Sequence, residues 1–390
     1  MSTDPTPPAP VTAFDDSARD GQGPASQLIG AFDYLNASGR PEAAAVRALV
    51  DQWLAEYPAP NRPALIRRLR SRDDVLHRSA FFELLLHALL IRQGFTIAEI
   101  EPQLANGRAP DFLVEAPDGR RFYLEATLAS GMDNVSAGAN RRMREALQAI
   151  DDVESPDFFL HLHSRGMPTQ PIATSRLRRS VQRFVDGLDY EEAVARAAAD
   201  QPPARIWQHD EHGAHFMIQP VPKRTPRPGG RAIGGRMLPA CIIHPEIAIK
   251  SAIEGKAGRY GNTDIPLVIA VNALEEFAGI NDAIEALFGT TGVVIPENGE
   301  PRHVRNADGA WRNAGGPVYT RSSAVLFVER LSAWSVGQRS LRLILNPWAR
   351  SPIAGLPLGI EVREVVGDRL QTLPGQSLRA IFRLPEGWPE

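Results

Sequence analysis

Three acidic residues occupy positions where a carboxylate could do chemistry. Glu83 lies in the run FFELLLHALL, and a carboxylate among apolar neighbours is costly unless it is paired or bound to a cation. Asp111 follows a proline in APDFLVE, and Glu125 lies in the run RFYLEATLA. Two carboxylates with a backbone carbonyl suit Mg²⁺, which prefers oxygen ligands and keeps several waters. At Glu83 the alternative is a structural pair with an arginine.

The elements that must position these acids follow from the spacing of apolar residues. Residues 73–93 are predicted to form a buried helix that ends at Gly94. Strands are expected at residues 96–101, 111–115 and 122–128. The last two are joined by the turn APDGR, whose Asp-Gly pair is typical of a hairpin. Such a hairpin can bring Asp111 close to Glu125.

Further elements are predicted along the chain. A helix at residues 134–150 and an apolar strand at residues 158–164 complete an αβββαβ series. Beyond it we expect a helix at 174–188, a hairpin at 206–221, a helix at 245–259 and a buried strand at 266–272. The fold class predicted is therefore α/β, with a helical N-terminal element and a mixed α+β C-terminal extension.

A helix carrying Glu83, then Pro-Asp-Phe, then a hairpin leading into Leu-Glu-Ala-Thr resembles the PD-(D/E)XK, or restriction endonuclease-like, nuclease superfamily over about residues 75 to 165. The resemblance implies that Asp111 and Glu125 are metal ligands and that Ala126 lends its carbonyl. It also implies that Glu83 matches the acid found in the first helix of many members. The cofactor implied is Mg²⁺, or Mn²⁺ in its place.

The chain departs from this superfamily at one residue, because Thr127 stands where the motif has lysine. Threonine supplies no positive charge to orient water or neutralise a phosphate. The only lysines are Lys223, Lys250 and Lys256, so a lysine from another element must be one of these. Lys256 is the best candidate, because its helix precedes a buried strand. Otherwise an arginine substitutes, the site is inactive, or Lys256 merely supports the end of its helix.

The charge balance allows only a local nucleic-acid site. The 43 basic and 46 acidic residues give a net charge of −3, which provides no global attraction to nucleic acid or to an acidic membrane. The run KRTPRPGGRAIGGR contains five cations and no acid, and we predict a flexible loop that contacts phosphates. These cations are Lys223, Arg224, Arg227, Arg231 and Arg236. A solvated loop without a partner is the alternative.

Other polar clusters have simpler explanations. His209, His212 and His215 lie near Glu211 at an expected hairpin turn, and a short histidine cluster matches metal-ligand spacing by chance. His161 and His163 share one face of an expected strand. Core histidines with hydrogen-bond partners are the commoner case, but this face could also point into the proposed site. A second basic run comprises Arg176, Arg178, Arg179 and Arg183.

Composition sets the outer limits of the prediction. We expect a disordered tail at 1–26, a helical element at 27–72, a nuclease-like core with an inserted hairpin and basic loop at 73–275, and a C-terminal region at 276–390. The lone Cys241 cannot form an internal disulfide, and no apolar run is long enough to cross a bilayer. A cytoplasmic protein is therefore expected, with no membrane partner.

Two functions are compatible with the sequence. The first is a Mg²⁺-dependent nuclease that hydrolyses phosphodiester bonds, with DNA favoured over RNA as the substrate, within a bacterial defence or repair system. The second is a nuclease-like fold without activity that serves as a nucleic-acid-binding or assembly module. Thr127 favours the second function, and the three acids favour the first.

Overall fold

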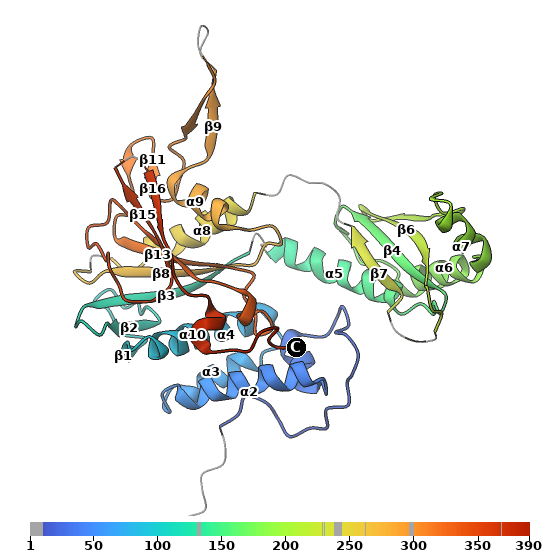
Figure 1. Cartoon of the computed structure of the whole chain (residues 1–390), viewed down its shortest axis with the longest axis horizontal. Coiled ribbons are helices and arrows are strands. Elements are labelled where there is room, and N and C mark those ends of the chain that lie inside the picture. The colour runs from blue at the N-terminus through green and yellow to red at the C-terminus, as the bar shows by residue number, and fades with distance from the viewer. Residues whose placement is uncertain are drawn as a thin grey trace, which may run out of the picture. The chain divides into compact units, whose positions relative to one another are not determined.

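The computed structural model describes residues 11–130, 134–227, 229, 231–237, 244–261, 263–295, 300–367 and 369–390. Two compact units make up the chain, and each is described by itself (Figure 1). The large unit comprises Met1–Gln22, Gly30–Gly131 and Ile243–Glu390, and the inserted unit comprises Gly23–Ile29 and Met132–Ile242.

The large unit is built on an eight-stranded mixed sheet in the order β1-β2-β3-β8-β13-β14-β15-β16. Its strands are β1 (Thr96–Ile100), β2 (Phe112–Glu115), β3 (Arg121–Ala129), β8 (Leu267–Ala273), β13 (Ser322–Glu329), β14 (Arg342–Leu345), β15 (Glu361–Val366) and β16 (Arg369–Leu373). Strands β1, β2 and β3 pair antiparallel, whereas β3, β8 and β13 run parallel. The centre of the sheet is thus parallel and its edges are antiparallel.

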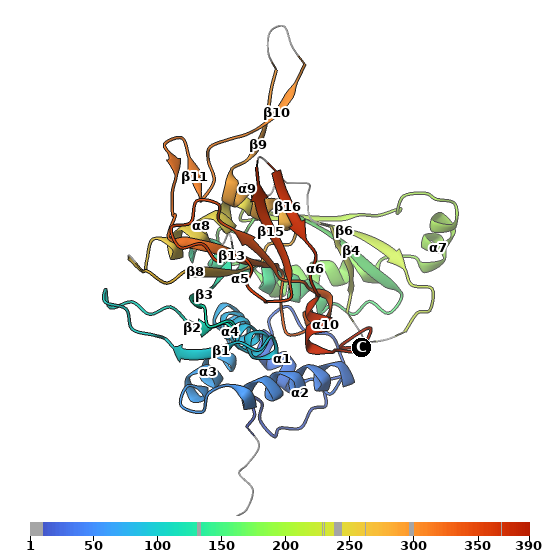
Figure 2. The ribbon, with the colours of Figure 1, turned by 60° about the vertical axis from the view of Figure 1, so that its left-hand side comes forward.

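Burial explains why the central strands are almost wholly apolar. Every residue of β8 is buried, because helices cover both faces of the sheet. Helix α4 (Asp74–Arg92) covers one face, and α8 (Pro245–Ala257) and α9 (Ile280–Phe288) cover the other. Figures 1 and 2 show this layering from two directions.

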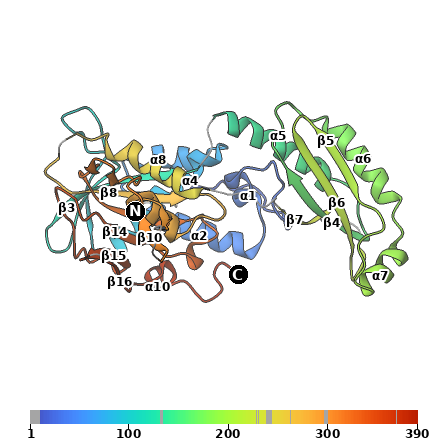
Figure 3. The ribbon, with the colours of Figure 1, turned by 90° about the horizontal axis from the view of Figure 1, so that it is seen from above.

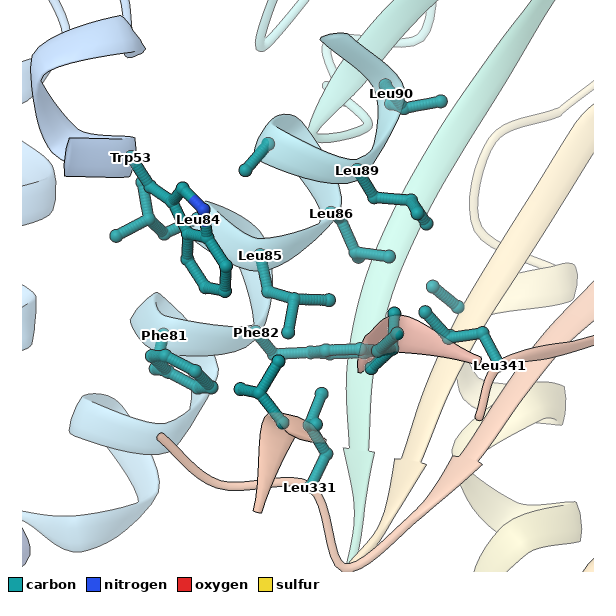
Figure 4. Close-up of a cluster of buried hydrophobic side chains, with 14 of the residues drawn as sticks. Trp53, Phe81, Phe82, Leu84, Leu85, Leu86, Leu89, Leu90, Leu331 and Leu341 are labelled. Carbon is teal, nitrogen blue, oxygen red and sulfur yellow. The ribbon is translucent and has the colours of Figure 1, made fainter. Parts of the chain in front are cut away.

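Helix α4 is the main apolar element of the first layer. It begins at an Asp73 carboxylate that accepts a hydrogen bond from the backbone of Val75, and Gly94 follows its end with a φ of 79°. Figure 4 shows Leu86 and Leu89 pointing toward the strands. On the other side of α4 lie α1 (Ala31–Ala37), α2 (Pro41–Glu56) and α3 (Arg62–Leu69), whose buried residues join the same core.

The remaining elements of the large unit are short. They are β9 (Thr291–Val294), β10 (Arg302–Arg305), β11 (Arg312–Asn313), β12 (Gly316–Pro317), the 3-10 turn η1 (Val336–Gln338) and α10 (Leu378–Phe382). No helix in the described part of the chain has the length and apolar content required to cross a bilayer.

The inserted unit has its own sheet and its own core. Its four strands are β4 (Phe158–Arg165), β5 (Trp207–Glu211), β6 (Ala214–Pro222) and β7 (Ile233–Met237), in the order β5-β6-β4-β7. Its helices are α5 (Asn134–Asp151), α6 (Thr174–Asp186) and α7 (Tyr190–Ala198). Apolar residues of α5 and α6 pack against one face of this sheet (Figure 3).

The structure corrects the expected arrangement of the core. The sequence predicts that the strand at residues 158–164 completes the series that contains the acids, but β4 belongs to the sheet of the inserted unit. The strand that pairs with β3 on the side away from β2 is β8, so an insertion of about a hundred residues after β3 interrupts the series α4, β1, β2, β3, α8, β8. Periodicity predicts each element, but it carries no information on which sheet a strand joins.

Two boundaries also differ from expectation. Within the predicted tail, Ala13 and Phe14 are buried, and Ala13 donates a backbone hydrogen bond of 2.8 Å to Asp51. Residues 1–10 lie outside the described residues. The predicted C-terminal region is no separate domain, because β13 to β16 extend the sheet that contains β3.

Candidate metal site

Asp111 and Glu125 meet where β2 separates from β3. Strand β2 pairs with β3 only as far as Phe112 and Leu124, and Asp111 is the residue before this last pair. The Asp111 N–H donates to Glu125 Oε2 at 3.2 Å. In the other direction, the Ala126 N–H donates to Asp111 Oδ2 at 2.6 Å. The Glu125 carboxylate is therefore held by the backbone of Asp111, and the Asp111 carboxylate by the backbone of Ala126, which follows Glu125.

The geometry leaves oxygen atoms in positions to hold a hard cation. In an extended strand, the N–H and C=O of one residue point to the same edge, so the Ala126 carbonyl faces the same side as its N–H. Among the described residues, no three His, Cys, Asp or Glu side chains are grouped to hold a metal ion. A cation here would therefore bind Asp111, Glu125, the Ala126 carbonyl and water, a set that fits Mg²⁺.

Lys256 supplies the positively charged side chain of this site. Its ammonium, near the end of α8, donates to Glu125 Oε1, and its side chain is only 23% exposed. The other two lysines lie elsewhere. Lys250 donates to the Asp308 carbonyl at 2.7 Å, and Lys223 belongs to the inserted unit. A positive charge therefore lies beside Glu125. It comes from α8 and not from β3, the strand that carries Thr127.

Burial and the neighbouring carboxylates both act on the pKa of Asp111. Burial raises the pKa of Asp111 to about 8, and the charges of Glu125 and Glu83 add to the increase. The Ala126 N–H and Lys256 act in the opposite direction. The carboxyl is withdrawn from solvent, although the residue as a whole keeps some exposed surface. Perturbed carboxylates of this kind are typical of functional sites.

Tyr260 is a member of this site that sequence reasoning missed. It lies just after α8, is 4% exposed, and its hydroxyl has no hydrogen-bond partner among the described residues. Burial raises the pKa of its phenol, and the nearby Glu125 carboxylate adds to the increase. Tyr260 thus stays neutral beside the Glu125 carboxylate. Nothing in its local sequence pattern distinguishes it from a core tyrosine.

Glu83 is paired with an arginine, and its oxygens are not free to bind a metal ion as the resemblance implies. Arg68 of α3 donates to both of its oxygens, at 2.6 and 2.9 Å, and the Tyr57 hydroxyl donates at 2.8 Å. Its charge reaches Asp111, whose pKa it helps to raise, but its oxygens are already occupied. The alternative interpretation, a structural ion pair, is the one that the structure supports, and Glu83 is not a metal ligand in this arrangement.

This pairing predicts that a substitution of Glu83 lowers the stability of the folded protein. Glu83→Gln leaves Arg68 half-buried without a full countercharge, and we expect a loss of about 1 to 3 kcal/mol with metal affinity nearly unchanged. Urea unfolding and Mn²⁺ titration measure the two effects. Glu145→Gln, which breaks an exposed pair with Arg141, is the matched control and should change stability by less than about 1 kcal/mol. Lost metal binding with unchanged stability would contradict the structural role.

His87, one turn from Glu83, is expected to make stability depend on pH. Its ring is 1% exposed and packs 4.7 Å from the Tyr57 ring, and its Nδ1 has no partner among the described residues. Burial lowers its pKa from 6.5 to about 4. The unfolded chain binds this proton more tightly, so its contribution is complete above pH 6.5 and is lost as pH falls toward 4.

The expected loss is about 3 kcal/mol over this interval. Between pH 7 and pH 4, the free energy of unfolding should fall by about 3 kcal/mol more for the wild type than for His87→Phe. The same measurement on the exposed His303→Gln should follow the wild type. An identical slope for His87→Phe would show that His87 is not buried in its neutral form.

The remaining predicted sites lie in the inserted unit. His209 binds Glu211 at 2.9 Å and His215 binds Asp210 at 2.8 Å, and these pairs are no metal site. His161 and His163 are on β4, outside the sheet that carries the acids. Cys241 lies outside the described residues.

Several residues of the basic run are held by hydrogen bonds or ion pairs or lie in a strand, which differs from the predicted flexible loop. Lys223 is 6% exposed and donates to the Ser155 carbonyl at 2.6 Å, and Arg231 pairs with Asp151 at 3.0 Å. Arg236 is part of β7 rather than of a loop. Arg224 and Arg227 are exposed, and neither side chain makes a hydrogen bond or ion pair with another described residue.

The sequence matches no protein-family model. Searches of curated proteins and of solved structures also returned no match. The site must therefore be interpreted from its own chemistry.

Proposed function

We propose that the large unit is a Mg²⁺-dependent phosphodiester hydrolase that acts on nucleic acid, with DNA as its main substrate. One observation carries the proposal: two carboxylates and a lysine ammonium converge where a strand pair separates. The lysine comes from α8, and it supplies the charge that Thr127 lacks.

The order of elements supports the same proposal. Helix α4, the β1-β2-β3 meander, α8 and the parallel strand β8 form an αβββαβ series once the inserted unit is left out. This is the order expected of a restriction endonuclease-like core, and we propose that the large unit has such a core. Fold resemblance alone does not establish activity, so the argument for hydrolysis rests on the site.

Each group in the site has a role that its contacts support. Bound Mg²⁺ would polarise the scissile phosphate and lower the pKa of a coordinated water. Asp111 and Glu125 supply the negative charge that holds the ion, and their mutual repulsion makes a cation favourable there. Lys256 sits within hydrogen-bond reach of Glu125, where its ammonium can stabilise charge on a phosphate oxygen.

The proposal is tested by incubating the protein with supercoiled plasmid, linear duplex, single-stranded DNA and RNA, each with Mg²⁺, Mn²⁺ or EDTA. We expect cleavage of DNA that requires the metal and that is absent from an Asp111→Asn preparation purified in parallel. Absence of cleavage on all four substrates would favour the inactive, nucleic-acid-binding alternative. Equal cleavage by the wild type and Asp111→Asn would indicate a contaminating nuclease.

A further inference from the structure

The outer face of the inserted sheet carries a row of three aromatic rings. Phe159, His161 and His163 alternate along β4 with buried residues, so all three lie on the face opposite α5 and α6. We call these three side chains the aromatic row. Phe159 is 44% exposed, and the two histidine rings lie 5.1 Å apart. His163 Nε2 has no hydrogen-bond partner among the described residues.

Glycines on the neighbouring strand β7 leave the space beside the aromatic row free of β7 side chains. Gly234 and Gly235 of β7 lie beside Phe159 and His161. A Cβ at Gly234 would come within 2.5 Å of Phe159, and one at Gly235 within 3.2 Å of His161. Only glycine lets the Phe159 ring lie across the β7 backbone. No β7 side chain therefore stands beside Phe159 and His161 at these two positions.

A cationic groove begins at the Phe159 end of the row. It encloses about 730 Å³, and its lining includes Phe159, Gly234, Lys223, Arg224, Arg227 and Arg231. None of the described residues that line it is acidic. Lys223 lies 5.0 Å from the centroid of the Phe159 ring and is fixed by Ser155, while Arg224 and Arg227 are exposed. Arg165 adds a cation on the same face at the far end of β4.

One exposed ring and two half-buried rings on a sheet face, with arginines beside them, match the chemistry of unpaired nucleotides. Bases stack on aromatic side chains regardless of sequence, and phosphates bind exposed arginines. The three rings follow one another along the strand, with the two histidine rings 5.1 Å apart, so successive unstacked bases can lie along the row. A duplex hides the faces of its bases, so aromatic rings cannot stack on them.

We propose that the inserted unit binds single-stranded nucleic acid along the aromatic row, with the flanking phosphates held by Arg224 and Arg227. The inference does not rest on hydrolysis at the candidate metal site. It adds Phe159 and the two histidines to the basic residues that sequence analysis selected, and it specifies that the bound nucleic acid is unpaired.

Fluorescence anisotropy of the full-length protein in EDTA tests the proposal without cleavage. The probes are labelled strands of about 12 nucleotides, one of DNA and one of RNA, and a duplex of the same length. Both single strands, or one of them, should bind more tightly than the duplex, and the comparison of the two distinguishes DNA from RNA. Absence of binding to both strands, or duplex binding that is equal or tighter, would overturn the proposal.

Variants identify the surface. Phe159→Ala should weaken single-strand binding about tenfold or more, whereas Phe159→Trp should retain it. The control Phe277→Ala removes a ring of the large unit that is more exposed, at 64% against 44% for Phe159, and should have no effect. If Phe159→Ala and Phe277→Ala bind alike, the row is not the binding surface.

Salt dependence tests the phosphate contacts. The double variant Arg224→Ala/Arg227→Ala should lower the slope of log affinity against log salt by about 1.4, because each phosphate contact to a single strand contributes about 0.7. Arg178→Ala/Arg179→Ala removes the same charge from exposed positions on α6, which covers the opposite face, and should leave the slope nearly unchanged. Equal slopes for the two double variants would contradict the groove as the phosphate site.

Discussion

Asp111→Asn is expected to abolish both cation binding and cleavage. The substitution keeps an oxygen that can accept from the Ala126 N–H, but it removes one of the two carboxylates that hold the ion. Because metal catalysis contributes several kcal/mol, the cleavage rate should fall on the order of a thousandfold or more. Mn²⁺ should raise the melting temperature of the wild type but not that of Asp111→Asn.

The same substitution should make the metal-free protein more stable. The pKa of Asp111 is raised in the folded state, so the folded protein loses stability relative to the unfolded chain as pH rises from about 4 to about 8. Asparagine carries no charge and escapes this loss. At pH 8 in EDTA, Asp111→Asn should therefore unfold at a higher temperature than the wild type, and the difference should disappear at pH 4. A variant less stable than the wild type at pH 8 would contradict the crowded-charge account.

Lys256→Met is expected to stop cleavage while cation binding is retained. The ammonium supplies positive charge next to the scissile phosphate, and the loss of one such group costs about a hundredfold to a thousandfold in rate. Removing a cation from beside Glu125 cannot weaken metal binding through charge and should strengthen it slightly. Single-turnover cleavage and Mn²⁺ titration on the same preparation separate the two effects.

Lys250→Met is the matched control, because Lys250 lies on the same helix and donates to the Asp308 carbonyl instead of to an acid of the site. It should cleave at nearly the wild-type rate. Full activity of Lys256→Met would show that another group, or none, fulfils the role of the motif lysine. Loss of metal binding in Lys256→Met would show that the lysine has a structural role.

The local elements around the site follow from the sequence because their signals are local. The helix through Glu83, the hairpin between Asp111 and Glu125, and α8 with Lys256 have boundaries within about two residues of those expected. Lysine scarcity also narrowed the choice to three residues, and Lys256 is the one beside Glu125. These features depend on periodicity, turn residues and composition, which a single chain displays.

The long-range pairings could not be predicted in the same way. Strand β4 has the alternating apolar pattern of any half-buried strand, and nothing in it indicates a second sheet. Arg68 and Tyr57 bind Glu83 across a separation of 15 to 26 residues, and neither has a neighbour that marks it as a partner. Tyr260 and Phe159 were missed because an aromatic residue near a helix end or in a strand is ordinarily part of a core.

The central claim is that Asp111 and Glu125 share one divalent cation, and the anomalous diffraction of a crystal grown with Mn²⁺ tests it most directly. We expect a single strong peak at about 2.0 to 2.6 Å from a carboxylate oxygen of each residue, with the Ala126 carbonyl and waters completing the shell. A crystal with no peak between these two carboxylates, in which Lys256 remains the only cation bound to Glu125 at saturating Mn²⁺, would contradict the claim.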